Sequence, residues 1–224
     1  VSPTWFHLGP TPGEIENRAD MRYVNWAHDS GYKVWALFSN SFDTERTRAV
    51  LRDSALRDKV ASQMLILSQI YSLDGINLDF ENVYMDDAPY LTQFVRELTP
   101  LFHEQGLIVS MDVTVRSQAE NWSLCYQRER LAEAVDYMML MAYDQYWAGS
   151  PVAGPVSAIP WAEWTIQATL EEVPAEKLVL GVPFYTRLWK ETSSDGKISV
   201  TQQAYSMKGV SDWMRKNGVT PALD

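Results

Sequence analysis

The chain of 224 residues contains a single cysteine, Cys125, so no internal disulfide can form. Histidine is also scarce: His7, His28 and His103 lack the spacing of metal ligands, and no CxxC pair is present. The sequence also lacks the GxGxxG and GxxxxGK[ST] loops that bind nucleotide phosphates. We therefore expect neither a metal site nor another cofactor.

Positive charge is also in short supply, because the formal net charge is −10 and the isoelectric point is near 4.8. A field of this sign repels nucleic acids and anionic membrane surfaces, so a neutral or cationic ligand fits better. No apolar run reaches the roughly 20 residues of a membrane span. The opening VSPTWFHLGP lacks the basic region and the apolar run of a signal peptide. We expect no nucleic-acid partner and no membrane insertion, and nothing in the sequence indicates the oligomeric state.

Apolar runs of strand length alternate with helical patterns, and hydrophobic residues make up 46% of the chain. This alternation is typical of a parallel α/β architecture. Strands are predicted at 2–8, 33–38, 75–80, 107–115, 137–143 and 177–184. Helices are predicted at 18–30, 44–54, 57–71, 90–105, 128–134 and 161–171.

Such an alternation fits an open, doubly wound sheet or a closed eightfold barrel. Nucleotide loops typical of open sheets are absent, while polar and aromatic residues follow several strand ends, where a barrel carries its active site. We therefore predict a (β/α)8 TIM barrel that lacks its first and last strands in this chain. Either flanking sequence lies outside the chain, or two weak strands escape the pattern. Residues 1–224 would form one partial barrel domain, with 190–224 starting an insertion after the seventh strand that contains a hairpin near 198–201 and a helix over 207–217.

The segment 74–81, DGINLDFE, places acids at alternate positions of an otherwise apolar strand. Side chains alternate between the faces of a strand, so Asn77, Asp79 and Glu81 share one face. Backbones two positions apart are separated by roughly 6.5–7 Å, so the charge of Asp79 can keep a proton on Glu81. A solvated surface strand is the alternative, but the apolar neighbours favour burial, where acids are costly unless a cleft uses them. The segment therefore predicts a site of acid catalysis.

Two neighbouring strands also carry polar residues. Ser39 and Asn40 follow the strand 33–38, at the end where a barrel carries its site. On the strand 107–115, one face carries three polar side chains: Ser110, Asp112 and Thr114. We expect this face of 107–115 to add polar groups to the barrel interior.

The acid-bearing segment resembles the DGxDxDxE signature of family 18 glycoside hydrolases, the chitinase-like barrels. Residues 141–144, MAYD, resemble the family's MxYD motif. Residues 181–189, GVPFYTRLW, resemble its GxPxYGRxW strand, with Thr186 in place of glycine. The three motifs occur in the family's order. Asn77 replaces the middle aspartate of the signature, and it either retunes the distribution of protons along the row or only fills the barrel floor.

The resemblance implies hydrolysis in which the acetamido group of the substrate is the nucleophile. Glu81 would protonate the leaving glycosidic oxygen and then take a proton from water, while Asp79 would orient and stabilise the acetamido group. Tyr143 would hydrogen-bond the acetamido carbonyl, and Asp74 would support the row by sharing a proton with Asp79. These four residues are the predicted catalytic set.

Motif positions and strand ends also suggest six contacts with the substrate: Asn77, Met141, Asp144, Trp147, Tyr185 and Arg187. Aromatic rings can stack on the apolar faces of sugars. For Trp147, a place in such a groove and a place in the core are equal alternatives. For Arg187, the alternative to binding hydroxyl groups is a salt bridge with a loop carboxylate.

Within the family, the opening VSPTWFHL and the variant DGINLDFENV resemble the subgroup of spore-cortex and cell-wall lytic enzymes. This resemblance implies a glycosidase that cleaves β-1,4 bonds next to N-acetylglucosamine in peptidoglycan, secreted or located in the spore or cell envelope. Two alternatives remain open, a chitinase acting on chitin oligomers and a non-catalytic glycan-binding module. The presence of Glu81 weakens the second, because binding-only relatives are those that have lost the acid.

Overall fold

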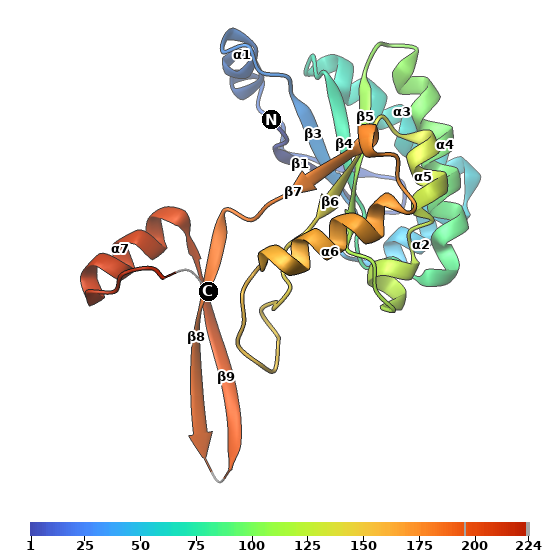
Figure 1. Ribbon diagram of the computed structural model, residues 1–224. Coiled ribbons are helices and arrows are strands. Elements are labelled where there is room, and N and C mark those ends of the chain that lie inside the picture. Colours follow the sequence, from blue (N-terminus) through green and yellow to red (C-terminus); the bar gives the residue numbers. More distant parts are fainter. Residues whose placement is uncertain (195, 223–224) are drawn as a thin grey trace. The chain divides into compact units, whose positions relative to one another are not determined.

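The computed structural model describes residues 1–194 and 196–222 (Figure 1). The chain divides into two compact units. The first contains Val1–Leu140 and Ala168–Val179, and the second contains Met141–Gln167 and Leu180–Asp224. A single barrel domain over 1–224 stays a prediction.

A sheet in the order β2-β1-β3-β4-β5-β6-β7 forms the frame of the fold. Parallel pairings join β1 to β3, β3 to β4 and β4 to β5, whereas β2 runs antiparallel to β1. All six predicted strands are present, and β2 is an addition that is too short to show an alternating pattern. The strands are β1 (Thr4–Leu8), β2 (Ile15–Asn17), β3 (Trp35–Ser39), β4 (Gly75–Asp79), β5 (Ile108–Thr114), β6 (Tyr137–Met141) and β7 (Leu178–Gly181).

The six predicted helices are also present, and aspartates fix the start of several of them. Oδ1 of Asp53 accepts hydrogen bonds from the backbone N–H groups of Ala55 and Leu56, at 2.8 and 3.1 Å. This cap starts α3 three residues earlier than the predicted position 57, because it satisfies donors that a helix end leaves free. The helices are α1 (Met21–Asp29), α2 (Thr44–Arg52), α3 (Ser54–Ile70), α4 (Ala88–His103), α5 (Arg128–Ala134) and α6 (Ile159–Leu170), with short turns η1 (Met85–Asp87), η2 (Glu120–Leu124) and η3 (Ala175–Lys177).

The core lies between the sheet and the helices α2–α5, which gather on one side of β3, β4 and β5 (Figure 1). Ile76, Leu78 and Phe80 face this core and are at most 1% exposed. The Phe80 ring stacks on Phe94 of α4, with centroids 5.8 Å apart. Because side chains alternate along a strand, Asp79 at the end of β4 and Glu81 just after it emerge on the opposite face of the sheet.

Gly75 allows β4 and β5 to approach each other closely. A Cβ atom at this position would lie 2.4 Å from the carbonyl oxygen of Ile108, far inside contact distance. Any other residue would push the two strands apart where their pairing begins, with Gly75 opposite Ile108. The glycine thereby fixes the register in which polar groups on β4 and β5 meet.

The second unit contains a long hairpin of β8 (Tyr185–Ser194) and β9 (Lys197–Ser206), followed by α7 (Met207–Asn217). The helix agrees with the prediction, but the hairpin is much longer than the predicted 198–201. The strand predicted over 177–184 ends at Gly181, shortly before Pro183, which has no N–H group for a sheet. The GVPFYTRLW motif is therefore divided between β7 and β8.

Within the described ranges, no helix combines the length and the apolar character needed to cross a membrane.

Candidate active site

Two acids meet where β4 ends. Asp79 is the last residue of β4 and Glu81 follows two positions later, and their side chains are hydrogen-bonded to each other. Both residues are partly buried. The second oxygen of Asp79, Oδ1, is buried and has no hydrogen-bond partner among the described residues. The structure thus brings together the two acids that carry the predicted chemistry.

Asn40, the residue after β3, holds the backbone of Glu81 through its side-chain amide. Its Nδ2 donates to the carbonyl oxygen of Glu81 at 2.7 Å, and its Oδ1 accepts from the N–H of Glu81 at 3.0 Å. Nδ2 also donates to Oγ1 of Thr47 at 2.9 Å. Asn40 is fully buried, so these bonds are shielded from water. The sequence placed Asn40 near the site but did not indicate this contact.

The residues around Glu81 are held in a similar way. The hydroxyl of Tyr126 donates to the carbonyl oxygen of Phe80 at 2.8 Å. Asn82 adopts a left-handed backbone conformation with φ of 52°, and its Nδ2 donates to the carbonyl oxygen of Phe42 at 2.9 Å. Contacts from several elements therefore fix the turn that carries Glu81, as a preorganised catalytic group requires.

Asn77 lies on the same face and connects β4 to β5. Oδ1 of Asn77 accepts from the hydroxyl of Ser110 at 2.8 Å, and its Nδ2 donates to Oδ2 of Asp112 at 2.7 Å. Asn77 is 5% exposed and belongs to a built polar network, so it does more than fill space. Its predicted contact with substrate stays a prediction.

Burial shifts the proton equilibria of this row. It raises the pKa of Asp79 to about 6, against the opposing effect of the hydrogen bond with Glu81. It raises the pKa of Asp112 to about 7, where the charge of Asp79 adds to the effect and the hydrogen bond from Asn77 opposes it. Carboxyl groups whose pKa is raised by burial are common at functional sites.

Asp74 lies at the other end of β4, and its predicted role requires correction. Its carboxylate accepts hydrogen bonds from Lys33 Nζ at 2.8 Å and from the N–H of Val34 at 2.9 Å, and it lies 2.9 Å from His28 Nε2. Burial raises its pKa, but these partners outweigh burial and lower it. Five strand positions separate Asp74 from Asp79, or roughly 16 Å, so the two cannot share a proton. The acid next to Asp79 is Asp112.

In the second unit, Asp144 accepts a hydrogen bond from the hydroxyl of Tyr185 at 2.5 Å and another from Arg187 at 2.7 Å. The side chain of Arg187 is 8% exposed, so the salt-bridge alternative describes it better than binding of sugar hydroxyls. Burial and the Asp144 carboxylate raise the pKa of Tyr185. The rings of Tyr143 and Tyr185 meet edge to face, with centroids 6.4 Å apart. The MAYD and GVPFYTRLW motifs therefore form one polar and aromatic cluster.

Two further predicted contacts also belong to the second unit. Met141 is the last residue of β6 and is partly buried. Trp147 is 59% exposed, which rules out the core alternative and leaves its ring available to a ligand. Its predicted role as a substrate contact stays a prediction.

Phe42 and Trp122 are two exposed aromatic residues near the acids, and no sequence motif points to them. They are 52% and 43% exposed, and their ring centroids lie 6.1 Å apart. Both adjoin Asn82, which donates to the Phe42 carbonyl oxygen and whose Oδ1 accepts from Asn121, 3.4 Å away. The signal in the sequence was their position, because Phe42 lies in the loop after β3 and Trp122 in the segment after β5.

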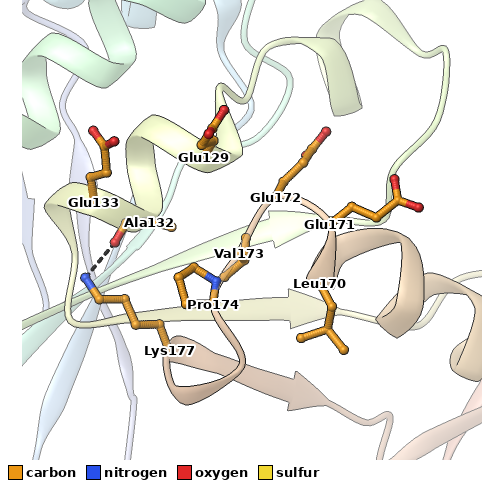
Figure 2. A pocket seen from close by; sticks show the side chains of 9 residues that line it. All are labelled: Glu129, Ala132, Glu133, Leu170, Glu171, Glu172, Val173, Pro174 and Lys177. Atoms are coloured by element: carbon orange, nitrogen blue, oxygen red, sulfur yellow. Dashed lines mark hydrogen bonds between the residues drawn. The ribbon is translucent and has the colours of Figure 1, made fainter.

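A separate pocket of about 450 Å³ lies between α5 and the segment 170–177 (Figure 2). Lys177 lines this pocket, and its Nζ donates to two carbonyl oxygens at the end of α5, at 2.6 and 2.8 Å. Arginines outside the pocket pair with three of its four glutamates. The polar groups serve the fold, and no predicted site residue lines the pocket. The glutamates are Glu129, Glu133, Glu171 and Glu172.

Comparison with known proteins shows the family and the fold of the chain. The protein YvbX of Bacillus subtilis (strain 168), named an uncharacterized glycosylase, is 24% identical over 223 residues, which cover 95% of this chain and 62% of YvbX. The cortical fragment-lytic enzyme of the same organism is 30% identical over 156 residues, or 68% of this chain and 36% of the relative. The crystal structure of the Bacillus cereus spore cortex-lytic enzyme SleL matches with a TM-score of 0.86 at 19% identity, covering 100% of this chain and 52% of SleL.

Residues 11–221 match the family described as glycosyl hydrolases family 18, so the chain belongs to this family. The predicted family is confirmed, and so is the α/β fold class of the chitinase-like barrels. The chain spans less than two thirds of the length of the curated relatives reported above.

Proposed function

We propose that this chain carries the catalytic acids of a glycosidase that cleaves β-1,4 bonds next to N-acetylglucosamine in peptidoglycan of the spore cortex or cell wall. The observation that carries the proposal is the hydrogen-bonded pair of Asp79 and Glu81 at the carboxyl end of β4, with the Glu81 backbone held by Asn40. Such an acid pair on a fixed turn suits general acid catalysis.

In the proposed reaction, Glu81 donates its proton to the glycosidic oxygen as the bond to the anomeric carbon breaks. The carbonyl oxygen of the substrate's own acetamido group attacks that carbon, which forms an oxazolinium ion. Glu81 then takes a proton from the water that opens this ring, so the anomeric configuration is retained. Two carboxyl groups, the substrate and one water molecule supply every atom of this scheme.

Asp79 is the second participant in this scheme. Its carboxylate suits the role of acceptor for the acetamido N–H, and its charge suits stabilisation of the positive charge on the oxazolinium. Tyr143 would hydrogen-bond the acetamido carbonyl oxygen and hold it in line for attack. Asn77, Met141, Asp144, Trp147 and Tyr185 remain candidates for contacts around the sugar.

The choice of peptidoglycan draws on the relatives whose names mention cortex lysis, and a location at the spore or cell envelope follows from the same proposal. Chitin is the second candidate substrate, because a di-N-acetylchitobiase of Homo sapiens is 30% identical over 147 residues. Both polymers present the acetamido group that the proposed chemistry requires.

The proposal is tested by incubating the intact protein with cortex peptidoglycan and, separately, with chitin oligomers. New reducing ends are labelled by borohydride reduction and identified by mass spectrometry. We expect N-acetylglucosamine at the new reducing ends of peptidoglycan, and proton NMR of the unreduced products is expected to show the β-anomer first. Faster cleavage of chitin would favour the second candidate, and binding without cleavage of either polymer would indicate a glycan-binding module.

The exposed pair of Phe42 and Trp122 gives a prediction about polymer binding. Replacing both by alanine removes two apolar faces beside Asn82 on which sugar rings can stack. We expect KM on long glycans to rise about thirtyfold with little change in kcat, since the two stacking contacts contribute about 1 kcal/mol each. Steady-state kinetics on long and short glycans checks this, with the exposed Trp164→Ala as a control of the same kind. A fall in kcat with an unchanged KM would contradict this prediction.

A further inference from the structure

A second buried acid, Asp112, lies on β5 beside Asp79. The register of the two strands pairs Leu78 with Met111, so Asp112 comes next to Asp79 on the same face. Neighbouring strands lie about 4.8 Å apart, and the charge of Asp79 raises the pKa of Asp112, so the two carboxyl groups are electrostatic neighbours. The proposed reaction makes no use of Asp112.

One oxygen of the Asp112 carboxyl group is held by a hydrogen bond, whereas one oxygen of Asp79 lacks a hydrogen-bond donor among the described residues. Oδ2 of Asp112 accepts the hydrogen bond from Asn77, whose amide is oriented by the Ser110 hydroxyl. Asp79 uses its side chain to bond Glu81, but its Oδ1 is buried and lacks a donor among the described residues. A proton on Asp112 would supply this missing donor.

The surroundings of the pair favour such a proton. No basic side chain in the described part of the chain forms an ion pair with Asp79 or Asp112, and two adjacent buried carboxylates cannot both ionise cheaply. Burial raises the pKa of both groups, to about 7 for Asp112 and about 6 for Asp79. The hydrogen bond with Glu81 favours the anion of Asp79, so Asp112 is the better place for a shared proton. At neutral pH this leaves Asp79 as the anion.

Few other charged groups face the pair. The pair faces Glu81, which follows β4, and Tyr126, in the segment after β5. The Tyr126 hydroxyl donates to the Phe80 carbonyl oxygen, and the Arg128 guanidinium lies against the Tyr126 ring. On the other side, β3 presents the neutral Ser39 opposite Asp79. On β6, Tyr137 is the titratable residue and stacks on Trp35. None of these groups neutralises the pair.

We infer that Asp112 is a positioning residue of the active site, which in its protonated form donates a hydrogen bond to Oδ1 of Asp79 and orients that carboxylate for the substrate. The substrate part of this inference rests on the proposed function, whereas the hydrogen bond does not. No proton is transferred to the glycan from Asp112. When Asp112 ionises, its proton goes to solvent, and Asp79 loses a donor and gains a repelling neighbour.

The inference predicts a change in the pH dependence of hydrolysis. The wild-type kcat is expected to fall as the pH rises through about 7, where Asp112 loses its proton. In Asp112→Asn the amide N–H donates at every pH, so this step is expected to disappear. Asp112→Ala has no donor and is expected to be about tenfold slower at pH 6, the effect of one lost hydrogen bond. Ser110→Ala removes a neutral contact of the same network and should keep the wild-type pH profile.

Carbon-13 NMR of the aspartate carboxyl groups tests the same contact without substrate. Asp112 is expected to titrate near pH 7, and Asp79→Asn is expected to lower its midpoint by about one pH unit by removing the neighbouring charge. An unmoved midpoint, or a kcat of Asp112→Asn that still falls through pH 7, would overturn the inference. Because the titration needs no glycan cleavage, its failure is distinguishable from failure of the proposed function.

Discussion

Replacing Glu81 by glutamine is expected to lower kcat on the cleaved glycan by about 10²- to 10⁴-fold, the usual contribution of a positioned general acid. Glutamine has the same shape and can still hydrogen-bond Asp79, so the fold should be preserved. Glutamine has no acidic proton to give to the leaving oxygen, and the turn that carries residue 81 stays fixed by Asn40 and Tyr126. Initial rates and a thermal unfolding curve for each variant check this result.

The nature of the leaving group makes the assignment of Glu81 more specific. In aryl glycosides of acidic phenols, the leaving phenolate needs no proton. Glu81→Gln is therefore expected to lose far less activity on these substrates than on the natural glycan. The exposed Glu176 on η3 offers a matched control, since Glu176→Gln removes the same charge away from β4. Loss of activity below threefold for Glu81→Gln on the natural glycan would falsify its role as the acid.

Replacing Asn40 by alanine is expected to reduce both stability and activity. The change leaves the buried partners of the Asn40 amide without their hydrogen bonds, including the N–H and carbonyl groups of Glu81. Buried unsatisfied groups cost about 1–3 kcal/mol each, so we expect unfolding to become easier by about 2–5 kcal/mol. Because the turn also loses its fixed position, we expect kcat to fall roughly tenfold or more even where the variant is fully folded.

Thr47 separates the two effects. Thr47→Val removes the hydroxyl that accepts from Asn40 Nδ2, while both bonds between Asn40 and Glu81 can remain. This variant is expected to lose about 1 kcal/mol of stability and to keep its kcat within about twofold. Urea unfolding and steady-state kinetics at a temperature where both variants are folded provide the comparison. An Asn40→Ala enzyme with normal kcat would show that Asn40 serves stability alone.

The elements of the first unit were predictable because their patterns are local. Strand β4 reads as an alternation of apolar and polar residues, and the helices repeat apolar residues at helical spacing. Boundaries depended on individual groups: Asp53 starts α3, and Pro183 prevents β7 from continuing. The length of the β8–β9 hairpin was underestimated, because its strands are largely polar and exposed and carry little periodic signal.

Within the site, the sequence determined that Asn77, Asp79 and Glu81 share one face, since strand geometry alone requires it. It could not determine which groups face them from other strands. Only the strand register brings Asp112 next to Asp79, and only the turn after β3 brings Asn40 onto the backbone of Glu81. The role of Asp74 was wrongly predicted because residues close in sequence can lie far apart along an extended strand, and five positions separate Asp74 from Asp79.

The sequence by itself determined the alternation of strands and helices, the family and the acids that carry the proposed chemistry, because each is written in consecutive residues. The tertiary structure decided which carboxyl groups are neighbours and which are buried, and burial raises the pKa values of Asp79 and Asp112. These properties arise from contacts between β3, β4 and β5, and the free energy of a buried charge depends on neighbours that are far away along the chain.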